Sequence, residues 1–455
     1  MTTADTIILH LSDIHFRRHG PSGELLDPDL DLRNELEADA AAVQTRLGPV
    51  AAILVNGDIA FSGQREEYAR AKEWLDALCA RLRCPPERVF TTPGNHDVDR
   101  SAIRSSKLLQ LCHAELRTRE VDALDFGLRE YFDDSAARTA LFLPITAYNE
   151  FAARYGCAID ADTPYWEYDG LILNDGSTLV IRGVTSTLVS DEYDDDASYK
   201  LVLGSFQATL PRQDGVEYLV LCHHPPQWLR DQDDIEDVLN ARVRIQLYGH
   251  KHKQKVESVD QRALRVTAGA FQPDRRELNW QPRYNYLNIR VDGGPGDRVL
   301  SVDVYPRVWN KEAHRFGADY DLEGSDKRHF NFALPDWEAP HRTPVVVPDE
   351  SLMQVPPAHD GSEAGEEAFA PREEARMDVD RRLTYRFLNL PYQRRLAVAQ
   401  QLGLVQDDDQ FLSDTNRYRA VFRRARESGR LGELWTAVEQ NYDDGQGDPN
   451  PFMGR

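Results

Sequence analysis

Residues 6–15 read TIILHLSDIH, and this stretch decides the fold of the first part of the chain. The apolar run at 7–11 is typical of a buried strand, and Asp13 and His15 follow it directly. Helical patterns separate this run from further short apolar runs, so the sequence predicts an α/β fold over residues 6–308. The further runs lie at 52–55, 89–91, 179–181, 218–222 and 245–248.

The chain divides into regions of different character. A largely helical stretch at 101–158 interrupts the rhythm of strands, and we expect it to be an insertion that forms a cap. Alternating runs at 286–291 and 299–305 predict an antiparallel hairpin that ends the domain. The expected units are a catalytic domain at 1–335, an acidic linker with prolines at 336–377, a helical bundle at 378–442 and a disordered tail at 443–455.

Composition excludes several classes of protein. The 455 residues include 54 Lys+Arg and 76 Asp+Glu, a net charge of −22, and 41% hydrophobic residues. This is ordinary globular usage, and the acidity counts against a non-specific DNA binder, which needs cations to displace counterions. No apolar run reaches the ~18 residues of a membrane span. The 5 cysteines are scattered, which argues against a disulfide framework or a zinc ribbon, and we expect a cytoplasmic protein.

Polar motifs follow the predicted strands. The carboxyl ends of strands in an α/β sheet share one rim, so these motifs are expected to converge in space. Alone, each motif is weak evidence, because Asp-x-His usually marks a turn and Gly-Asp says almost nothing. Together and in order, their carboxylate, imidazole and amide groups favour a site for two metal ions, with Mn preferred and Fe, Zn or Ni as alternatives. The motifs are Asp13-Ile14-His15, Gly57-Asp58, Gly94-Asn95-His96-Asp97, His223-His224-Pro225 and Gly249-His250-Lys251-His252.

With these motifs, residues 6–308 resemble the calcineurin-like metallophosphoesterase superfamily. The resemblance implies a β-sandwich flanked by helices and a pair of metal ions that activate water and orient a phosphate ester. It also implies that His96 is a catalytic histidine outside the metal ligands and that Asp97 orients His96 or its loop. The implied ligands are Asp13, His15 and His252 for one metal, Asn95, His223 and His250 for the other, and Asp58 as the bridge between them.

The substrate is less constrained by the sequence. Arg17 and Arg100 follow metal motifs directly and are candidates for gripping a phosphate, and His224 is a candidate substrate contact or loop residue. We favour a phosphodiesterase that acts on a nucleotide or nucleic acid, including a nuclease. The alternatives are a phosphomonoesterase or phosphoprotein phosphatase and, in a different class, a non-catalytic scaffold. His113 and other histidines outside the motifs are expected to be surface or locally satisfied groups.

Helical spacing returns near the C-terminus. Tyr418, Val421, Phe422 and Ala425 recur at helical intervals, and residues 431–438 repeat the pattern. The segment resembles the small effector-associated adaptor modules of bacterial conflict systems. The resemblance implies homotypic docking to a protein partner that carries a similar module, with the phosphoesterase as an effector in antiviral defence. The alternative is a helical appendage that dimerises or packs on the catalytic domain. A flexible linker would let proteolysis release two folded pieces, and the oligomeric state stays open.

Overall fold

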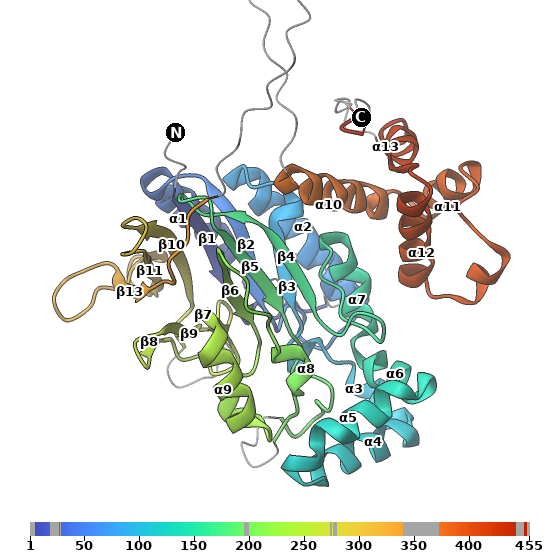
Figure 1. Ribbon diagram of the computed structural model, residues 1–455, viewed down its shortest axis with the longest axis horizontal. Helices are drawn as coiled ribbons and strands as arrows, with labels where there is room; N and C mark the ends of the chain where they lie inside the picture. The colour runs from blue at the N-terminus through green and yellow to red at the C-terminus, as the bar shows by residue number, and fades with distance from the viewer. Residues whose placement is uncertain are drawn as a thin grey trace, which may run out of the picture.

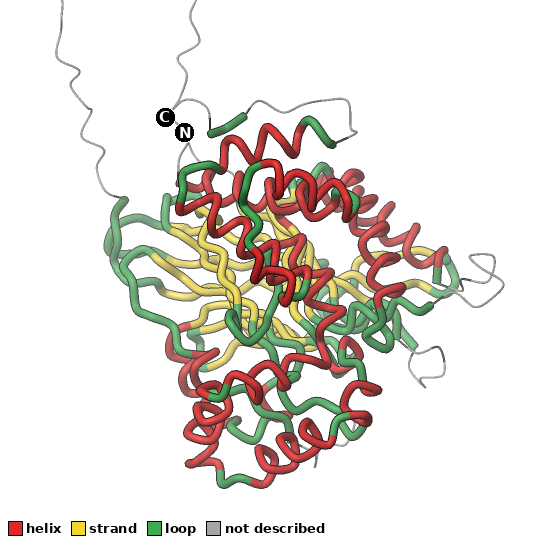
Figure 2. The backbone as a smooth tube through the Cα atoms, turned by 90° about the vertical axis from the view of Figure 1, so that its right-hand side faces the viewer, coloured by secondary structure: helices red, strands yellow, loops and turns green. Residues whose placement is uncertain are grey.

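The computed structural model describes residues 5–18, 27, 29–194, 200–273, 275, 280–339, 373–442 and 450–452. Among these residues, no helix combines the length and the apolar character that a bilayer crossing requires. Two stacked sheets lie at the centre, and helices cover them on the outside (Figures 1 and 2). The expected α/β class with helices around the sheets is confirmed.

The first sheet carries the N-terminal strand in its middle. β1 pairs in parallel with β2, β2 pairs in parallel with β3, and β10 runs antiparallel to β1. β10 and β11 form the expected antiparallel hairpin, with Asp292 opposite Val299. The strands are β1 (Thr6–Leu11), β2 (Val50–Asn56), β3 (Val89–Thr92), β10 (Arg283–Asp292), β11 (Val299–Asn310), β12 (Arg315–Ala318) and β13 (Arg328–Ala333).

The second sheet has a parallel centre and antiparallel edges. β5, β6, β7 and β9 are parallel neighbours, and β4 and β8 close the two edges in antiparallel fashion. One apolar core joins the two sheets, because residues such as Leu54, Leu219 and Leu247 are fully buried in a single cluster. The strands are β4 (Trp166–Ile172), β5 (Thr178–Gly183), β6 (Val216–Leu221), β7 (Val243–Tyr248), β8 (Lys255–Val259) and β9 (Ala263–Thr267).

Helices flank the sheets, and a helical insertion follows β3. Figure 1 shows α3 to α6 gathered below the sheets and away from α1 and α2. The stretch at 101–158 is helical as expected, since α3 to α7 occupy most of it. The helices are α1 (Leu30–Leu47), α2 (Arg65–Leu82), α3 (Arg100–Ser105), α4 (Lys107–Thr118), α5 (Leu124–Asp133), α6 (Ser135–Phe142), α7 (Thr146–Ala152), α8 (Ser205–Ala208) and α9 (Gln232–Arg242).

A helical bundle with its own apolar core forms the C-terminal part. Its core contains Phe387, Tyr418 and Trp435 and is separate from the core of the sheets. Phe422, which the spacing placed in this core, is only partly buried. The helices are α10 (Glu373–Asn389), α11 (Tyr392–Gln401), α12 (Asp414–Glu427) and α13 (Leu431–Glu439).

α10 belongs to both cores. Leu383 lies in the core of the bundle, whereas Tyr385 lies in the core of the sheets and donates a hydrogen bond to Asp76 Oδ1. Arg381 is 8% exposed, and its guanidinium donates to the carbonyl oxygens of Glu87 (2.7 Å) and Val89 (3.1 Å) at the start of β3. The bundle is therefore docked on the catalytic domain through α10.

Two expected boundaries differ from the structure. The helix α10 begins at Glu373, inside the range 336–377 that was expected to be linker, and most of that range lies outside the described residues. The expected disordered tail, 443–455, contains residues 450–452, which lie against α13. There Asn450 donates to the carbonyl of Gly432 (2.8 Å), and the Phe452 ring centroid lies 6.1 Å from that of Trp435. An apolar ring that finds an aromatic partner explains this contact.

Candidate metal centre

The sequence motifs converge on one rim, as expected. Each strand of the two central parallel runs ends at this rim, and a short loop then carries polar side chains over it. Asp13 and His15 follow β1, Asp58 follows β2, Asn95 and His96 follow β3, His223 and His224 follow β6, and His250 and His252 follow β7.

The donor atoms approach one another closely. Within each of several overlapping groups of three side chains, the candidate ligand atoms all lie within 4.8 Å of one another. Asp58 belongs to more than one group, as a bridging carboxylate would. The shortest separations are His223 Nε2 to Asp58 Oδ2 at 3.3 Å, His252 Nε2 to Asp13 Oδ1 at 3.3 Å, His250 Nδ1 to Asn95 Oδ1 at 3.1 Å, and His15 Nε2 to Asp58 Oδ2 at 4.0 Å.

The chemistry of the donor set fits metal ions. Buried polar atoms normally have hydrogen-bond partners, so an unpartnered one needs an explanation. At this rim several such atoms form no hydrogen bond within the described part of the chain, although two of them lie 3.3 Å from an oppositely charged group, and a cation among them would give each an electrostatic partner. These atoms are Asp13 Oδ1, His15 Nδ1, His223 Nε2 and His224 Nε2. His223 is also oriented from behind, because its Nδ1 lies 2.8 Å from the carbonyl oxygen of Asn56, which leaves Nε2 to face the rim.

Left-handed backbone places most of these side chains. The φ angles are 55° at Asp13, 54° at His15, 52° at Asp58, 67° at His250 and 53° at His252. Such angles are uncommon outside glycine and cost on the order of 1–3 kcal/mol each. The surrounding structure therefore holds five of the seven candidate ligands in a conformation that their own backbones disfavour.

Two glycines make room for these groups. A Cβ atom at Gly57 would lie 2.3 Å from His223 Nδ1, and φ is +77° there. A Cβ atom at Gly94 would lie 2.2 Å from Asp58 Oδ1. Any larger residue would push the imidazole or the carboxylate out of place, which gives a physical reason for glycine in both motifs.

Burial and charge act in opposite directions on the ionisable groups. Burial would lower the pKa of the His223 imidazole, but the nearby Asp58 carboxylate raises it to about 9. Burial, together with the neighbouring His96, lowers the pKa of His15 to about 3, so its ring is neutral and has a lone pair to offer. A cation would replace the proton that His223 otherwise shares with Asp58.

His96 lies beside these groups and is half-buried. Its ring centroid lies 4.6 Å from that of His15, and its backbone N–H donates to Asp58 Oδ1 at 2.8 Å. The ring Nδ1 lies 2.8 Å from the carbonyl oxygen of Phe61, and this contact orients the ring and leaves Nε2 for other partners.

Asp97 is turned away from the site. Its carboxylate accepts hydrogen bonds from the backbone N–H groups of Ala60 (2.9 Å) and Gly94 (2.9 Å) and from the hydroxyl of Tyr68 (2.8 Å). Of the two expected roles, orienting His96 or orienting its loop, these contacts fit the second, since the carboxylate ties the loop after β2 to the loop after β3. Asp97 is a positioning residue for both loops.

The three candidate substrate residues have different surroundings. Arg100 lines a cavity of about 340 Å³ together with His96, and Arg17 lies with its guanidinium carbon 3.8 Å from the ring centroid of Phe61, which lines the same cavity. His224 is fully buried, and its Nδ1 lies 2.7 Å from the Ser186 hydroxyl. His224 is therefore a neighbour of the candidate ligands rather than an exposed substrate contact.

Some residues of the site were missed in the sequence. Phe61 and Arg104 line the cavity beside His96, and the Trp228 ring centroid lies 4.3 Å from that of His250. Phe61 and Trp228 each follow a motif by a few residues, and this closeness was the available signal. The two-sheet fold and the rim of carboxylates and histidines define a class of metal-dependent hydrolases.

Comparison with known proteins names the family. The sequence matches the profile of the calcineurin-like phosphoesterases over residues 6–254 and that of the GTPase-associated adaptor domain over residues 380–440. The chain belongs to the calcineurin-like phosphoesterase family, whose reaction is the hydrolysis of phosphate esters. Both resemblances found in the sequence are thereby confirmed. A search of curated proteins gave no match.

Several solved structures show a distant likeness. A dimetal phosphatase from Danio rerio is 12% identical, with 72% of this chain and 99% of that chain covered and a TM-score of 0.37. A putative 5′-nucleotidase from Staphylococcus aureus is 13% identical, with 74% and 55% covered and a TM-score of 0.34. A calcineurin-like phosphoesterase from Bacillus subtilis is 12% identical, with 72% and 91% covered and a TM-score of 0.30. The family assignment rests on the sequence match and not on these structures.

Proposed function

We propose that this protein is a dinuclear metal-dependent phosphodiesterase that acts on a nucleotide or a nucleic acid strand. The observation that carries the proposal is the cavity beside His96, which is lined by Arg18, Arg100, Arg104 and Phe61. A cluster of arginines exceeds what a single isolated phosphate would need next to a pair of metal ions. Further phosphates of a longer substrate would use them.

The charge pattern supports an extended anionic substrate. The chain as a whole carries a net charge of −22, and three arginines line this cavity with a single carboxylate, that of Asp99, although Arg104 also pairs with Glu192 at 3.4 Å. One terminal nitrogen of Arg100 is buried and unpartnered within the described residues, and a phosphate oxygen would satisfy it. The Arg17 guanidinium lies 3.8 Å from the ring centroid of Phe61 and adds a further cation beside this cavity.

The candidate ligands take the roles that the resemblance implies. Asp13, His15 and His252 would hold one metal ion, Asn95, His223 and His250 the other, and Asp58 both. Carboxylate, imidazole and amide ligands favour Mn, with Fe, Zn or Ni as alternatives. Bound metal ions would supply charge neutralisation of the phosphate and activation of a water molecule.

His96 handles the leaving group in this proposal. Its Nδ1 is engaged by the carbonyl oxygen of Phe61, so in the protonated ring Nε2 carries the proton that can be given to the leaving oxygen. The hydrogen bond from the His96 backbone to Asp58 Oδ1 keeps the ring at a fixed place relative to the bridging carboxylate. Arg100 and Arg104 then bind the parts of the substrate beyond the scissile phosphate.

A pair of model substrates tests the reaction class. Bis(p-nitrophenyl) phosphate, a diester, and p-nitrophenyl phosphate, a monoester, carry the same leaving group. Comparing the kcat/KM for the diester with that for the monoester, in the presence of Mn²⁺, therefore measures which kind of ester the enzyme prefers. We expect the diester to be hydrolysed faster, and Arg100→Ala to weaken hydrolysis of an oligonucleotide more than that of the small diester. Faster hydrolysis of the monoester would favour a phosphatase, and a folded, metal-loaded protein inactive on both would favour a scaffold.

The C-terminal module is proposed to recruit a protein partner. The GTPase-associated adaptor match suggests a partner linked to a GTPase, in keeping with an effector in bacterial defence. Arg423 on α12 is exposed and outside the metal site, and Arg423→Glu is expected to abolish co-purification with a GTPase-linked protein that carries the same domain, without changing hydrolysis of the small diester. Retained binding would contradict this use of α12.

The five cysteines are free and buried, which favours a reducing compartment, so we place the activity in the cytoplasm.

A further inference from the structure

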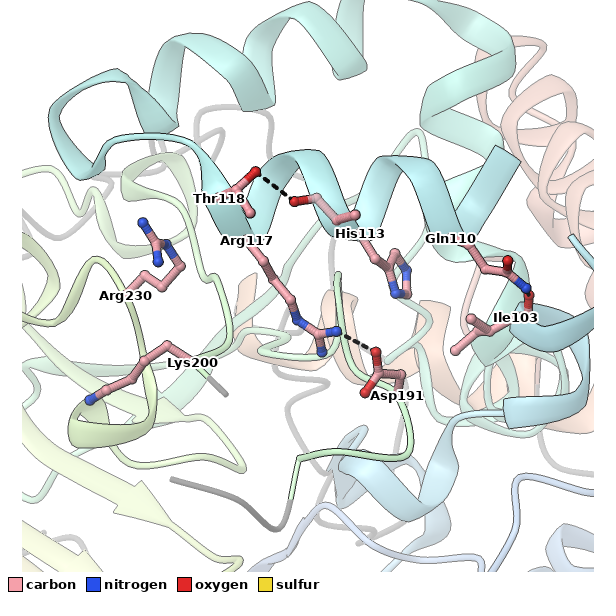
Figure 3. Close-up of a pocket in the computed structure, with 9 residues that line it drawn as sticks. Ile103, Gln110, His113, Arg117, Thr118, Asp191, Lys200 and Arg230 are labelled. Carbon is pink, nitrogen blue, oxygen red and sulfur yellow. Dashed lines mark hydrogen bonds and ion pairs between the residues drawn. The ribbon is translucent and has the colours of Figure 1, made fainter. Parts of the chain in front are cut away.

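A second cavity lies between the helical insertion and the segments that follow β5 and β6. Its volume is about 380 Å³, which is in the range of small-molecule sites. Figure 3 shows Lys200 and Arg230 at one end, Ile103 and Gln110 at the other, and Arg117 between the two ends. None of the candidate metal ligands lines this cavity.

One end of the cavity carries two cations, Lys200 and Arg230, which also line an adjoining cavity together with Glu120, Asp122, Asp233 and Asp234. Lys200 Nζ donates to the carbonyl oxygen of Gln227, and an Arg230 terminal nitrogen donates to the carbonyl oxygen of Arg119 (2.6 Å). Both acceptors are neutral, and no carboxylate of the described residues forms an ion pair with either cation. In a chain of net charge −22, these two cations favour an anionic ligand such as a phosphate group.

Arg117 contributes differently, because it is already balanced. Its guanidinium forms an ion pair with Asp191 and lies 3.4 Å from Asp194 Oδ1. These contacts fix the wall of the cavity between the insertion and the segment after β5. Lys200 and Arg230 form no ion pair within the described residues, so these two cations would bind an anionic ligand.

The other end is suited to a flat, neutral group. His113, which was expected to be a surface or satisfied histidine, is only 3% exposed, and neither ring nitrogen has a partner within the described part of the chain. Burial, with a contribution from Arg117, lowers the pKa of His113 to about 4, so the ring is neutral at pH 7. Its unused hydrogen-bonding capacity lies beside the apolar side chain of Ile103. Gln110 is held in place because its amide donates to the carbonyl oxygens of Ile103 (3.2 Å) and Arg104 (3.0 Å).

We propose that this cavity binds a nucleoside monophosphate, with the phosphate between Lys200 and Arg230 and the base against His113 and Ile103. The proposal does not depend on the reaction assigned to the metal centre. The site is nevertheless adjacent to that centre in the chain. Arg230 follows Trp228, which packs on His250, and the helix α3 carries both Ile103 and the Arg100 of the first cavity.

Calorimetric titration of the full-length, metal-loaded protein with adenosine 5′-monophosphate tests the proposal. Binding at the metal centre is the part that a chelator abolishes, so the titration is repeated with chelator, and we expect binding at the cavity to persist. Adenosine and inorganic phosphate, titrated separately, should each bind at least about tenfold more weakly than the nucleotide, since each uses one end of the site.

Two kinds of variant separate charge from shape. Lys200→Ala/Arg230→Ala should weaken the chelator-resistant binding by at least about tenfold, because hydrogen bonds to charged groups are lost. Ala114→Phe keeps both cations but places a ring in the cavity from an exposed helical position, and it should also weaken binding. Lys107→Ala/Arg129→Ala, on exposed sites of the same insertion, should bind like the wild type.

The result that overturns the proposal is equally definite. Wild-type affinity in both the charge variant and Ala114→Phe, with unchanged thermal midpoints, would place the nucleotide elsewhere. Loss of all binding on addition of chelator would assign the nucleotide to the metal centre alone. Equal affinities for phosphate and for the nucleotide would show that the base makes no contribution to binding in this cavity.

Discussion

The metal rim and the docking face of α10 both bury charged groups, but they treat them differently. At the rim, Asp13, His15 and His223 retain buried atoms that form no hydrogen bond within the described residues, on left-handed backbone or beside tight glycines. At the docking face, Arg381 donates to two backbone carbonyls and lies 4.4 Å from the Phe90 ring centroid. Unsatisfied buried groups call for a ligand, whereas satisfied ones hold two parts of a protein together.

This contrast is tested most strongly at the bridge. Asp58→Asn should lower kcat for the diester by on the order of 10³-fold or more, because the shared ligand loses its charge and a metal contribution of several kcal/mol is lost. Elemental analysis should show close to two transition-metal ions per wild-type chain and a clear loss in the variant. Full metal content in the variant would remove Asp58 from the bridging role.

His96 should behave differently from the ligands around it. His96→Ala is expected to keep its metal ions and to lose about 10²–10⁴-fold in turnover, as for removal of a general acid. A diester with a much better leaving group should recover part of this loss, because it needs less protonation. His250→Ala is the matched control and should lose metal. Loss of metal in His96→Ala and full metal content in His250→Ala would make His96 the metal ligand and His250 the general acid.

The core of the bundle should matter for stability and not for chemistry. Trp435 is 1% exposed, so Trp435→Ala should destabilise the bundle by about 3–5 kcal/mol and leave hydrolysis of the small diester nearly unchanged. Phe422→Ala should cost less, since the Phe422 side chain is only partly buried. Denaturant unfolding of the two variants gives the comparison, and equal losses would contradict the difference in burial.

The docking face is expected to give the smallest effect. Arg381→Ala leaves the carbonyls of Glu87 and Val89 short of donors and should weaken docking by about 1–3 kcal/mol. Size-exclusion chromatography after cleavage between 340 and 372, a range outside the described residues, measures this: the wild-type pieces should stay associated and those of the variant should separate. Gln393→Ala, at an exposed position of α11, is the control. Separation of the wild-type pieces would instead support the prediction from the sequence that a flexible linker joins two independent domains.

The sequence was informative wherever chemistry follows a strand directly. Asp13, Asp58 and His250 could be predicted as neighbours because each comes immediately after a buried apolar run, and parallel strands bring their ends together. Their left-handed φ angles could not be predicted, since only the packed loops impose them.

Contacts between residues far apart in the sequence could not be predicted from local sequence patterns. Arg381 is a charged residue on a helix, and helical periodicity alone places such a residue on the side that faces solvent. Its hydrogen-bond partner Glu87 lies almost three hundred positions earlier in the chain, so no local pattern could indicate that Arg381 is buried. For the same reason, the burial of His113, which was expected to be a surface or locally satisfied histidine, could not be predicted. The full burial of His224, expected to be a loop residue or a substrate contact, was also not predicted, since it depends on Ser186 and the second sheet.

The shared position of α10 has a consequence for how such genes recombine. The match to the adaptor family begins at residue 380. The contact between α10 and the catalytic domain nevertheless includes Asp378, which accepts a hydrogen bond from Tyr168 (2.6 Å). A crossover anywhere upstream of α10 would bring in a foreign helix whose side chains must match Glu87, Asp76 and Tyr168 of the recipient. Successful chimaeras are therefore expected either to inherit α10 from the hydrolase parent or to show correlated replacements on both sides of this contact.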